Sequence, residues 1–282
     1  MAAILRSARF WTALVVPVLF LPSCAKGPTG PNDDSWHFFP GHVESFSSPL
    51  FRAGRQCWVY LPPGYASSSE RYPVLYLNDG EVAFDANDGL HANRITEELI
   101  RQGVIRPIII VAIENGAGHQ RWIDYTPWTS PTSAPNGGGD AYLIAIRDTL
   151  IPAVDGRYRT LHGPGNTAIG GMSLGGLIAT YAGYAYDSSF GMVGALSPSY
   201  GYASYKIEQY ATAVGRPPAF ARFYQDTGYP DDNDITHMEA IAIAQGFTPG
   251  VDLMSVTSVG AQHRVGAWER RLPQMLTFLF KR

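Results

Sequence analysis

Charge and cysteine are both scarce in this chain of 282 residues, and no long hydrophobic run is present. Charged residues make up 16% of the sequence, the net charge is −3, and we find no basic tract, which argues against nucleic-acid binding. Residues 10–21 are apolar but interrupted by Pro17, and this run is shorter than the ~20 residues that a membrane-spanning helix needs. Only two cysteines occur, Cys24 and Cys57. The 45% apolar content is that of a globular protein with a substantial core.

The first 23 residues are typical of an export signal. Arg6 and Arg9 precede the short apolar run, and no acidic residue accompanies them. The run ends at Leu21-Pro22-Ser23-Cys24, which resembles the lipobox of bacterial lipoproteins, whose cysteine becomes the lipidated N-terminus. We therefore expect a lipoprotein signal peptide at residues 1–23 and a lipid anchor on Cys24. This places the protein at the bacterial cell envelope, on the periplasmic face or the cell surface, or outside the cell if a plain signal peptide is cut nearby.

Two segments follow the expected signal. Residues 24–36 are polar and rich in glycine and proline, and they predict a flexible tether. Residues 37–282 have no second boundary or internal repeat and predict a single domain. If Cys24 is lipidated, Cys57 has no disulfide partner, and its apolar surroundings predict a small buried side chain.

Apolar runs alternate with helical periodicity along the expected domain. The expected strands are 43–50, 56–61, 72–78, 107–113, 167–170, 190–196, 219–226 and 251–256, and the expected helices are 88–102, 140–154, 174–185, 236–245 and 265–281. The run at 107–113 is apolar throughout, as expected of a parallel strand covered on both faces. The alternation predicts an α/β fold with one doubly wound, mostly parallel sheet and helices on both faces.

The segment Gly171-Met172-Ser173-Leu174-Gly175 has the pattern G-x-S-x-G between an expected strand and an expected helix. This is the sequence form of a nucleophile elbow, in which a sharp turn exposes the serine hydroxyl at the positive end of the helix. The alternative is a glycine-rich turn with an incidental serine. If Ser173 is a nucleophile, it needs a base and an orienting carboxylate, in the chain order serine, acid, histidine.

Two histidines follow Ser173 in the chain. His237 lies inside an expected helix, whereas His263 lies between the last expected strand and the last expected helix, where this architecture delivers its base. The acid should follow the strand at 219–226. The aspartates there are Asp226, Asp231, Asp232 and Asp234. Asp226 is expected at the strand end, and spacing alone does not rank Asp231 and Asp232, which lie in the loop beyond it.

A tetrahedral oxyanion would need two backbone N–H donors. One should be that of Leu174, and the other should come from Asp79-Gly80-Glu81, the loop after the strand at 72–78. The long irregular segment 114–139 is expected to be functional or disordered. Its glycine run at 137–139 lacks the lysine of a phosphate loop and predicts a hinge.

Residues 71–80, RYPVLYLNDG, resemble the YPVLYLLDG signature of the putative esterase (esterase D-like) family of α/β-hydrolases, which includes feruloyl, acetylxylan and enterochelin esterases, S-formylglutathione hydrolases and mycolyltransferases. Further matching blocks lie at 158–160, 171–176, 195–199 and 260–268. The resemblance implies the α/β-hydrolase fold, with Ser173 as nucleophile and His263 as base. It also implies Asp231 as the acid, with Asp232 as its nearest rival, and the Glu81 N–H as the second oxyanion donor.

The block Asp124-Tyr125-Thr126-Pro127-Trp128 resembles the family's loop beside the active site. Together with the loop after the strand at 72–78, it makes Asp79, Tyr125 and Trp128 candidates for the substrate pocket, with simple packing as the alternative. The expected activity is hydrolysis of a small-molecule or oligosaccharide ester, of the aryl, acetyl-sugar or siderophore type, through an acyl-enzyme and without a metal or organic cofactor. The alternatives are an acyltransferase on the same fold and a non-catalytic envelope binding protein.

Overall fold

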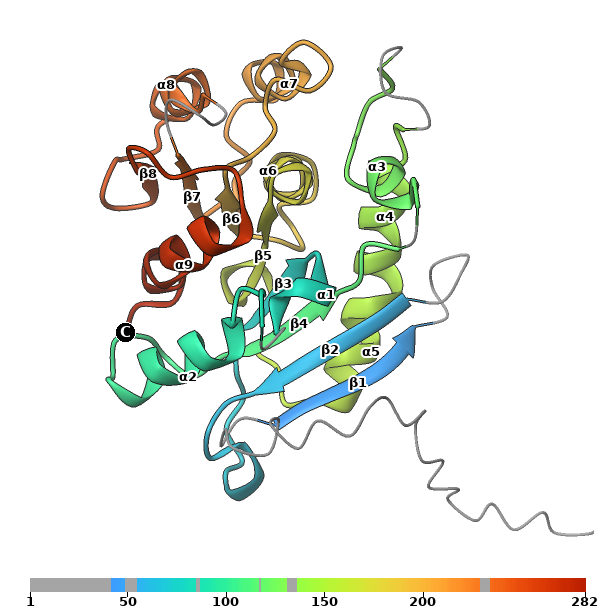
Figure 1. Ribbon diagram of the computed structural model, residues 1–282, viewed down its shortest axis with the longest axis vertical. Coiled ribbons are helices and arrows are strands. Elements are labelled where there is room, and N and C mark those ends of the chain that lie inside the picture. Colours follow the sequence, from blue (N-terminus) through green and yellow to red (C-terminus); the bar gives the residue numbers. More distant parts are fainter. Residues whose placement is uncertain (1–41, 49–54, 85–86, 117, 131–135, 229–233) are drawn as a thin grey trace, which may run out of the picture. The chain divides into compact units, whose positions relative to one another are not determined.

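The computed structural model describes residues 42–48, 55–84, 87–116, 118–130, 136–228 and 234–282. The described strands and helices belong to one compact unit (Figure 1). The expected signal peptide at 1–23, the tether at 24–36 with Cys24, and both Asp231 and Asp232 lie outside the described residues. No helix in the described part of the chain is both long and apolar enough to span a bilayer.

The described strands form a single sheet in the order β1-β2-β4-β3-β5-β6-β7-β8. The strands are β1 (His42–Ser48), β2 (Arg55–Leu61), β3 (Val74–Asn78), β4 (Ile109–Ile113), β5 (Thr167–Met172), β6 (Met192–Leu196), β7 (Arg222–Thr227) and β8 (Leu253–Thr257). The pairs β1–β2 and β2–β4 are antiparallel, and all the other neighbours are parallel. The predicted doubly wound, mostly parallel sheet is confirmed.

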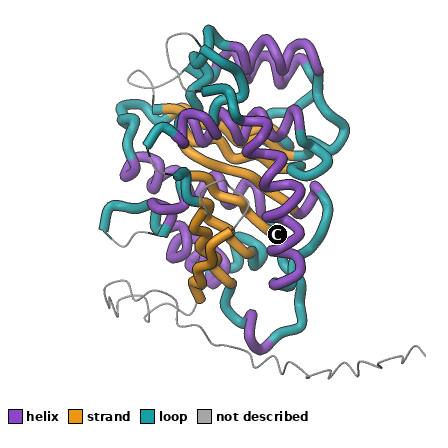
Figure 2. Tube along the Cα trace, turned by 90° about the vertical axis from the view of Figure 1, so that its right-hand side faces the viewer, coloured by secondary structure: helices purple, strands orange, loops and turns teal. Residues whose placement is uncertain are grey.

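Helices cover both faces of this sheet (Figures 1 and 2). The helices are α1 (Gly80–Ala83), α2 (Ala92–Arg101), α3 (Gln120–Asp124), α4 (Gly139–Ala145), α5 (Ile151–Arg157), α6 (Leu174–Ala185), α7 (Lys206–Val214), α8 (Thr236–Ala244) and α9 (Val265–Phe280). Successive side chains of a strand point to opposite faces. In β3, Val74 and Tyr76 therefore belong to the core beneath α4 to α8. Leu75 and Leu77 belong to the core beneath α1, α2 and α9.

Several helical segments differ from the sequence expectation. Helices α1 and α3 lie where a loop and an irregular segment were expected. The helix expected at 140–154 is divided by a π-helical turn at Ile146–Leu150, and α5 starts again with Pro152 in its first turn. Proline has no N–H to donate to the preceding turn, which is a physical reason for the local change in hydrogen bonding. Helix α7 was not predicted. It is short, and it follows three residues, Ala203 to Tyr205, with positive φ, a conformation that sequence periodicity does not signal.

Helix α6 packs so closely on the sheet that one of its glycines has no room for a side chain. A Cβ on Gly183 would lie 2.6 Å from Val193 Cγ2 and 2.7 Å from Phe220 Cζ. We expect Gly183→Ala to lower the free energy of unfolding by about 1–3 kcal/mol, because overpacking outweighs the better helix propensity of alanine. The midpoint and slope of urea denaturation measure this change.

Gly156 in α5 is the matched control, because a Cβ there would have no neighbour within 4 Å. Gly156→Ala should raise the stability by about 0.5–1 kcal/mol. A Gly183→Ala protein as stable as the wild type would contradict the close packing of α6 against β6.

Candidate active site

Ser173 lies in the sharp turn between β5 and α6, with φ 58° and ψ −120°. A non-glycine residue in such a conformation costs about 1–3 kcal/mol and persists only where its surroundings hold it. Three backbone hydrogen bonds do so here. The Ser173 N–H donates to Leu196 O (2.9 Å), and the Ser173 carbonyl accepts from the N–H groups of Leu177 (3.0 Å) and Ser199 (3.0 Å). The structure thus has the backbone of a nucleophile elbow.

The glycines of the motif are required by close contacts. A Cβ on Gly171 would lie 2.7 Å from the carbonyl carbon of Gly175. A Cβ on Gly175 would lie 3.0 Å from Asp79 Oδ2. The motif therefore brings the loop after β3 against the start of α6, and this places the two expected oxyanion donors on neighbouring segments.

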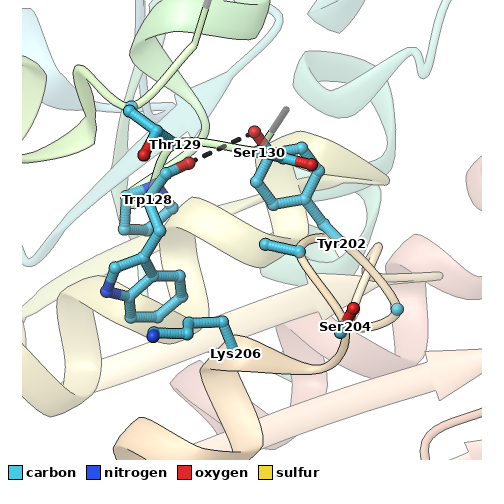
Figure 3. A pocket seen from close by; sticks show the side chains of 10 residues that line it. Trp128, Thr129, Ser130, Tyr202, Ser204 and Lys206 are labelled. Carbon is cyan, nitrogen blue, oxygen red and sulfur yellow. Dashed lines mark hydrogen bonds between the residues drawn. The ribbon is translucent and has the colours of Figure 1, made fainter. Parts of the chain in front are cut away.

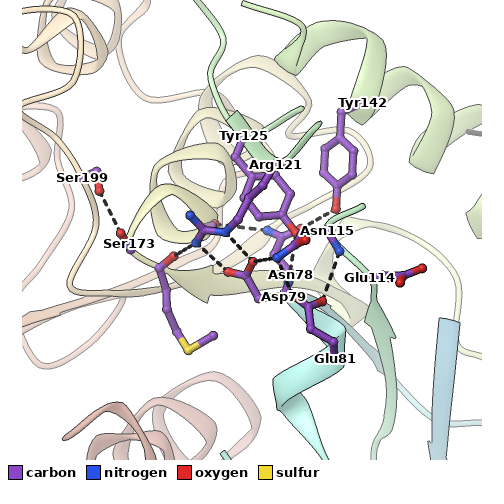
Figure 4. Close-up of polar contacts among 12 residues, drawn as sticks. Asn78, Asp79, Glu81, Glu114, Asn115, Arg121, Tyr125, Tyr142, Ser173 and Ser199 are labelled. Atoms are coloured by element: carbon purple, nitrogen blue, oxygen red, sulfur yellow. Dashed lines mark hydrogen bonds and ion pairs between the residues drawn. The ribbon is translucent and has the colours of Figure 1, made fainter. Parts of the chain in front are cut away.

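The side chain of Ser173 is half-buried and lies next to a second serine. Within the described part of the chain, the hydrogen-bond partner of the Ser173 Oγ is the Ser199 Oγ, at 3.2 Å (Figure 4). Leu174 is the first residue of α6, so its N–H has no partner within the helix and lies at the positive end of the helix dipole. Ser199 belongs to a matching family block, but its contact with Ser173 had no signal in the sequence.

The loop after β3 is held from several sides. Asp79 has φ 59°, and its N–H donates to the Tyr125 hydroxyl at 2.9 Å. A Cβ on Gly80 would lie 2.6 Å from backbone atoms of Ala112 and Ile113, so only glycine allows this approach to β4. Asn78 donates from Nδ2 to Gly175 O at 3.1 Å, which joins the end of β3 to the elbow.

A charged network surrounds Asp79 (Figure 4). Arg121 donates to it in a bidentate pair, with Nε to Oδ1 at 2.6 Å and Nη2 to Oδ2 at 2.9 Å, and also reaches Met172 O at 3.4 Å. Asn115 Nδ2 donates to Asp79 Oδ1 at 2.9 Å and to the Glu81 carboxylate. Asp79 is buried with these partners, so its carboxylate orders the loop around the site. The sequence offered no sign of Arg121, which lies 42 residues from Asp79.

Glu81 is the candidate for the second oxyanion donor, through its backbone N–H. Burial raises the pKa of its carboxyl, while hydrogen bonds from its own backbone N–H and from that of Asn115 oppose the rise. Glu81 is the second residue of α1, so its N–H is among those that have no acceptor within the helix.

The two aromatic candidates for the substrate pocket have different positions. Tyr125 is fully buried, and the Asp79 contact places it in the support of the loop rather than on a pocket surface. Trp128 lines a cavity of about 780 Å³, and its carbonyl accepts from the Tyr202 hydroxyl at 3.2 Å (Figure 3). The described lining residues are Pro127, Trp128, Thr129, Ser130, Gly137, Gly201, Tyr202, Ala203, Ser204 and Lys206. Gly201 is two residues along the chain from Ser199, the hydrogen-bond partner of Ser173.

His263 lies in the loop between β8 and α9. Its ring meets that of Trp268 edge to face, with the centroids 4.9 Å apart and the planes at 87°. The Trp268 indole N–H donates to Ser197 Oγ at 2.9 Å, so the tryptophan is tied to the end of β6. His237, by contrast, is exposed on α8, and its Nδ1 lies 3.7 Å from a Glu208 carboxylate oxygen.

A buried ion pair lies behind Ser197. Arg271 of α9 donates from Nη2 to Ser197 Oγ at 2.5 Å, and its Nε lies 3.1 Å from Asp226 Oδ1. Asp226 also accepts from the Ser197 N–H (3.0 Å) and the Tyr224 hydroxyl (2.9 Å). Burial raises the pKa of Asp226 from 3.8 to about 6, against the lowering effect of Arg271. This pair therefore joins β6, β7 and α9 just below the His263 loop.

Of the other three candidate acids, the structure describes only Asp234. The Asp234 carboxylate accepts from Thr236 N (2.8 Å) and Oγ1 (2.8 Å) at the start of α8. Asp231 and Asp232 lie outside the described residues, but the chain reaches them through Gly228. A Cβ on Gly228 would lie 1.7 Å from Ala261 O, so the start of their loop packs against the segment that leads to His263.

Among the residues that the structure describes, no group of three or more His, Cys, Asp or Glu side chains is arranged to hold a metal ion.

The raised pKa of Asp226 predicts a dependence of stability on pH. Between about pH 4 and pH 6 the folded state binds a proton on this group more tightly than the unfolded state, so its contribution to stability is present below pH 4 and lost as the pH rises to about 6. Asp226→Asn lacks this group. The free energy of unfolding of the wild type minus that of the variant should fall by roughly 2–3 kcal/mol over this interval.

Urea denaturation of both proteins from pH 4 to pH 7 measures this difference, in which the titration of all other groups cancels. A difference that stays constant over this range would contradict the raised pKa.

This chain is similar to a family of esterases and to individual bacterial proteins. A family model described as putative esterase matches residues 48–279. YbbA of Bacillus subtilis, an uncharacterized protein, is 28% identical over 179 residues, which cover 62% of this chain and 68% of that protein. An endo-1,4-beta-xylanase/feruloyl esterase of Xylanibacter ruminicola is 26% identical over 231 residues, which cover 79% of this chain and 29% of that protein.

The fold has solved counterparts. The structure of the enterobactin esterase of Shigella flexneri in the presence of enterobactin superposes with a TM-score of 0.68 at 20% identity, covering 86% of this chain and 59% of that one. This chain therefore spans less than two thirds of the enterobactin esterase and of the xylanase/feruloyl esterase. The match to the family model extends from the end of β1 to the end of α9, and the chain belongs to the putative esterase family.

Proposed function

We propose that this protein is a serine carboxylesterase with Ser173 as its nucleophile. The observation that carries the proposal is the strained backbone of Ser173, held between the end of β5 and the first N–H of α6. Strain of this kind is retained at sites where a side chain must be presented, and a G-x-S-x-G turn presents a hydroxyl. Membership of an esterase family supports the same reaction class.

In the proposed reaction, the Ser173 Oγ attacks the ester carbonyl carbon while His263 accepts its proton. The tetrahedral oxyanion accepts hydrogen bonds from the N–H groups of Leu174 and Glu81. The imidazolium of His263 then protonates the leaving alkoxide, and an acyl-enzyme remains. Water, activated by His263, releases the acid and restores Ser173.

We assign the acid of the triad to Asp231, with Asp232 as the alternative. Asp226 and Asp234 have other partners, the Arg271 pair and the start of α8 respectively. Gly228, the last described residue before Asp231 and Asp232, lies against Ala261, two residues before His263. A carboxylate beside His263 would hold the imidazole in the tautomer that accepts a proton from serine.

We infer that the acyl or alcohol part of the substrate occupies the cavity beside Trp128. Trp128 and Tyr202 supply aromatic surface, and the hydroxyls of Thr129, Ser130 and Ser204 supply hydrogen-bonding groups. Such a lining fits an aryl ester or an ester on a sugar, and feruloyl and enterobactin esterases among the similar proteins support these classes. Rates with methyl ferulate, acetylated xylan and enterobactin would separate aryl, acetyl-sugar and siderophore esters.

We also propose that the protein is exported and lipid-anchored at the cell envelope through Cys24. The proposal rests on the cationic start, the short apolar run and the Leu21-Pro22-Ser23-Cys24 sequence. An envelope location is compatible with an ester substrate that arrives from outside the cell.

Ser173→Ala tests the reaction. We expect the wild type to hydrolyse p-nitrophenyl acetate and to be labelled by a fluorophosphonate probe, because both need an activated serine. The variant should lose about 10⁴-fold or more of kcat and all labelling. Ser199→Ala is the matched control, since it removes the neighbouring hydroxyl and leaves the nucleophile in place. Absence of turnover and labelling in the wild type, or equal labelling of Ser173→Ala, would refute the esterase.

The acid is tested by comparing Asp231→Asn with Asp232→Asn. We expect the first to lose about 10⁴-fold of kcat, because the imidazole is then held in the wrong tautomer, and the second to retain most of its activity. Steady-state hydrolysis of p-nitrophenyl acetate and the pH profile of kcat/KM measure the effect. Loss confined to Asp232→Asn would transfer the assignment to Asp232.

A further inference from the structure

Four basic side chains line a pocket at the amino ends of the parallel strands, whereas Ser173 lies at their carboxyl ends. Ser173 follows the carboxyl end of β5, whereas this pocket lies at the amino ends of β6 and β7, which begin at Met192 and Arg222. The pocket has a volume of about 430 Å³. Its lining residues are Arg106, Gly165, Met192, Ala221, Arg222, Lys281 and Arg282. The lining side chains thus carry four positive charges and no negative charge.

Two of the four basic residues, Arg106 and Arg222, donate hydrogen bonds to uncharged acceptors. Arg222 donates from Nη1 to Leu279 O at 2.6 Å, at the carboxyl end of α9. Arg106 donates from Nη1 to Asn166 Oδ1 at 3.3 Å, and its guanidinium lies 5.9 Å from the ring centroid of Phe280. These contacts orient both guanidinium groups and use only part of the five N–H donors that each one has. A side chain oriented in this way binds a ligand with little further loss of entropy.

No carboxylate side chain of the described residues lines this pocket. Among the described residues, none of the four basic side chains forms an ion pair with an acid, whereas most other arginines of the domain do. The Nε of Arg106 is buried and has no hydrogen-bond partner in the described part of the chain. A buried donor left without an acceptor is a cost that a bound acceptor would remove.

The positive charges also act on one another. Burial lowers the pKa of Arg106, and the nearby charge of Arg222 lowers it further. Two guanidinium groups close enough to repel each other stabilise an anion placed between them. Arginine forks bind tetrahedral oxyanions in a bidentate manner, which a single chloride cannot match.

We propose that this pocket binds a phosphate or sulfate group, held by Arg106 and Arg222 with Lys281 and Arg282 at its rim. The ligand is either a free anion or phosphomonoester, or the phosphate of a lipid headgroup, since both present the same tetrahedral oxyanion. Because the pocket lies at the amino ends of the parallel strands and Ser173 at their carboxyl ends, this anion is not the ester that is hydrolysed. The site is therefore one for a ligand that stabilises the fold or locates the protein.

The first probe is inorganic phosphate, which is titrated into the protein. A titration with sodium chloride at the same ionic strength is the control. We expect saturable binding by isothermal titration calorimetry and a rise in Tm for the wild type. Arg106→Gln and Arg222→Gln should each weaken the binding about tenfold or more. Lys281→Gln/Arg282→Gln is a second test that leaves the packed residues in place, and it should weaken binding as well. Arg101→Gln, which removes an exposed arginine of α2 outside the pocket, should bind phosphate as the wild type does.

Sedimentation with phosphatidylglycerol or phosphatidylcholine vesicles distinguishes the sources of the phosphate. Saturable phosphate binding that the pocket variants lose supports a free anion or phosphomonoester. Sedimentation with phosphatidylglycerol vesicles that the pocket variants lose, without saturable binding of inorganic phosphate, supports a lipid headgroup. If neither probe binds the wild type, or if the pocket variants bind both as well as the wild type does, the proposal is wrong. Ser173→Ala should keep the anion site, so this result does not depend on the esterase proposal.

Discussion

The conformation of Ser173 is the constraint on which the centre of the molecule depends. Its positive φ places the hydroxyl above the sheet only because Leu196, Leu177 and Ser199 hold its N–H and carbonyl. Gly171 lets the strand and the first turn of α6 approach within a distance that excludes a side chain, and Gly175 leaves a tight contact for the Asp79 carboxylate. Much of the surrounding structure follows from this requirement, because the strained turn needs neighbours that cannot move away from it.

Two charged networks supply that rigidity on the two sides of β5, one at the end of β3 and the other at the ends of β6 and β7. The Asp79–Arg121 pair holds the loop after β3, and the Asp226–Arg271 pair holds Ser197 and, through it, Trp268 beside His263. Buried ion pairs are weak sources of stability, because desolvation cancels much of their attraction. Their place around the elbow is better explained by positioning, since each pair makes directional hydrogen bonds to a loop that would otherwise be free to shift.

The sequence predicted the parts of the fold that local pattern encodes. The apolar runs at 72–78 and 107–113 became β3 and β4, the run after the elbow became α6 with the expected bounds, and the alternation predicted the doubly wound sheet. The same patterns did not predict α7, the π-helical turn before α5, or Arg121 as the partner of Asp79. These features arise from positive φ values, from a proline and from contacts between residues far apart in the chain, none of which has a periodic signal.

The amino-acid sequence by itself therefore determined the fold class and the elbow, because hydrophobic periodicity and glycine spacing are local properties of the chain. The resemblance to a known family, and not the spacing, singled out Asp231, Glu81 and the aromatic residues as candidates. Only the tertiary structure decided which side chains meet. It placed Tyr125 in the core beneath the loop after β3, Trp128 on a cavity and Ser199 beside Ser173. It also gathered Arg106 and Arg222 around one pocket. Residues so far apart in sequence come together only when the sheet is assembled and burial selects their partners.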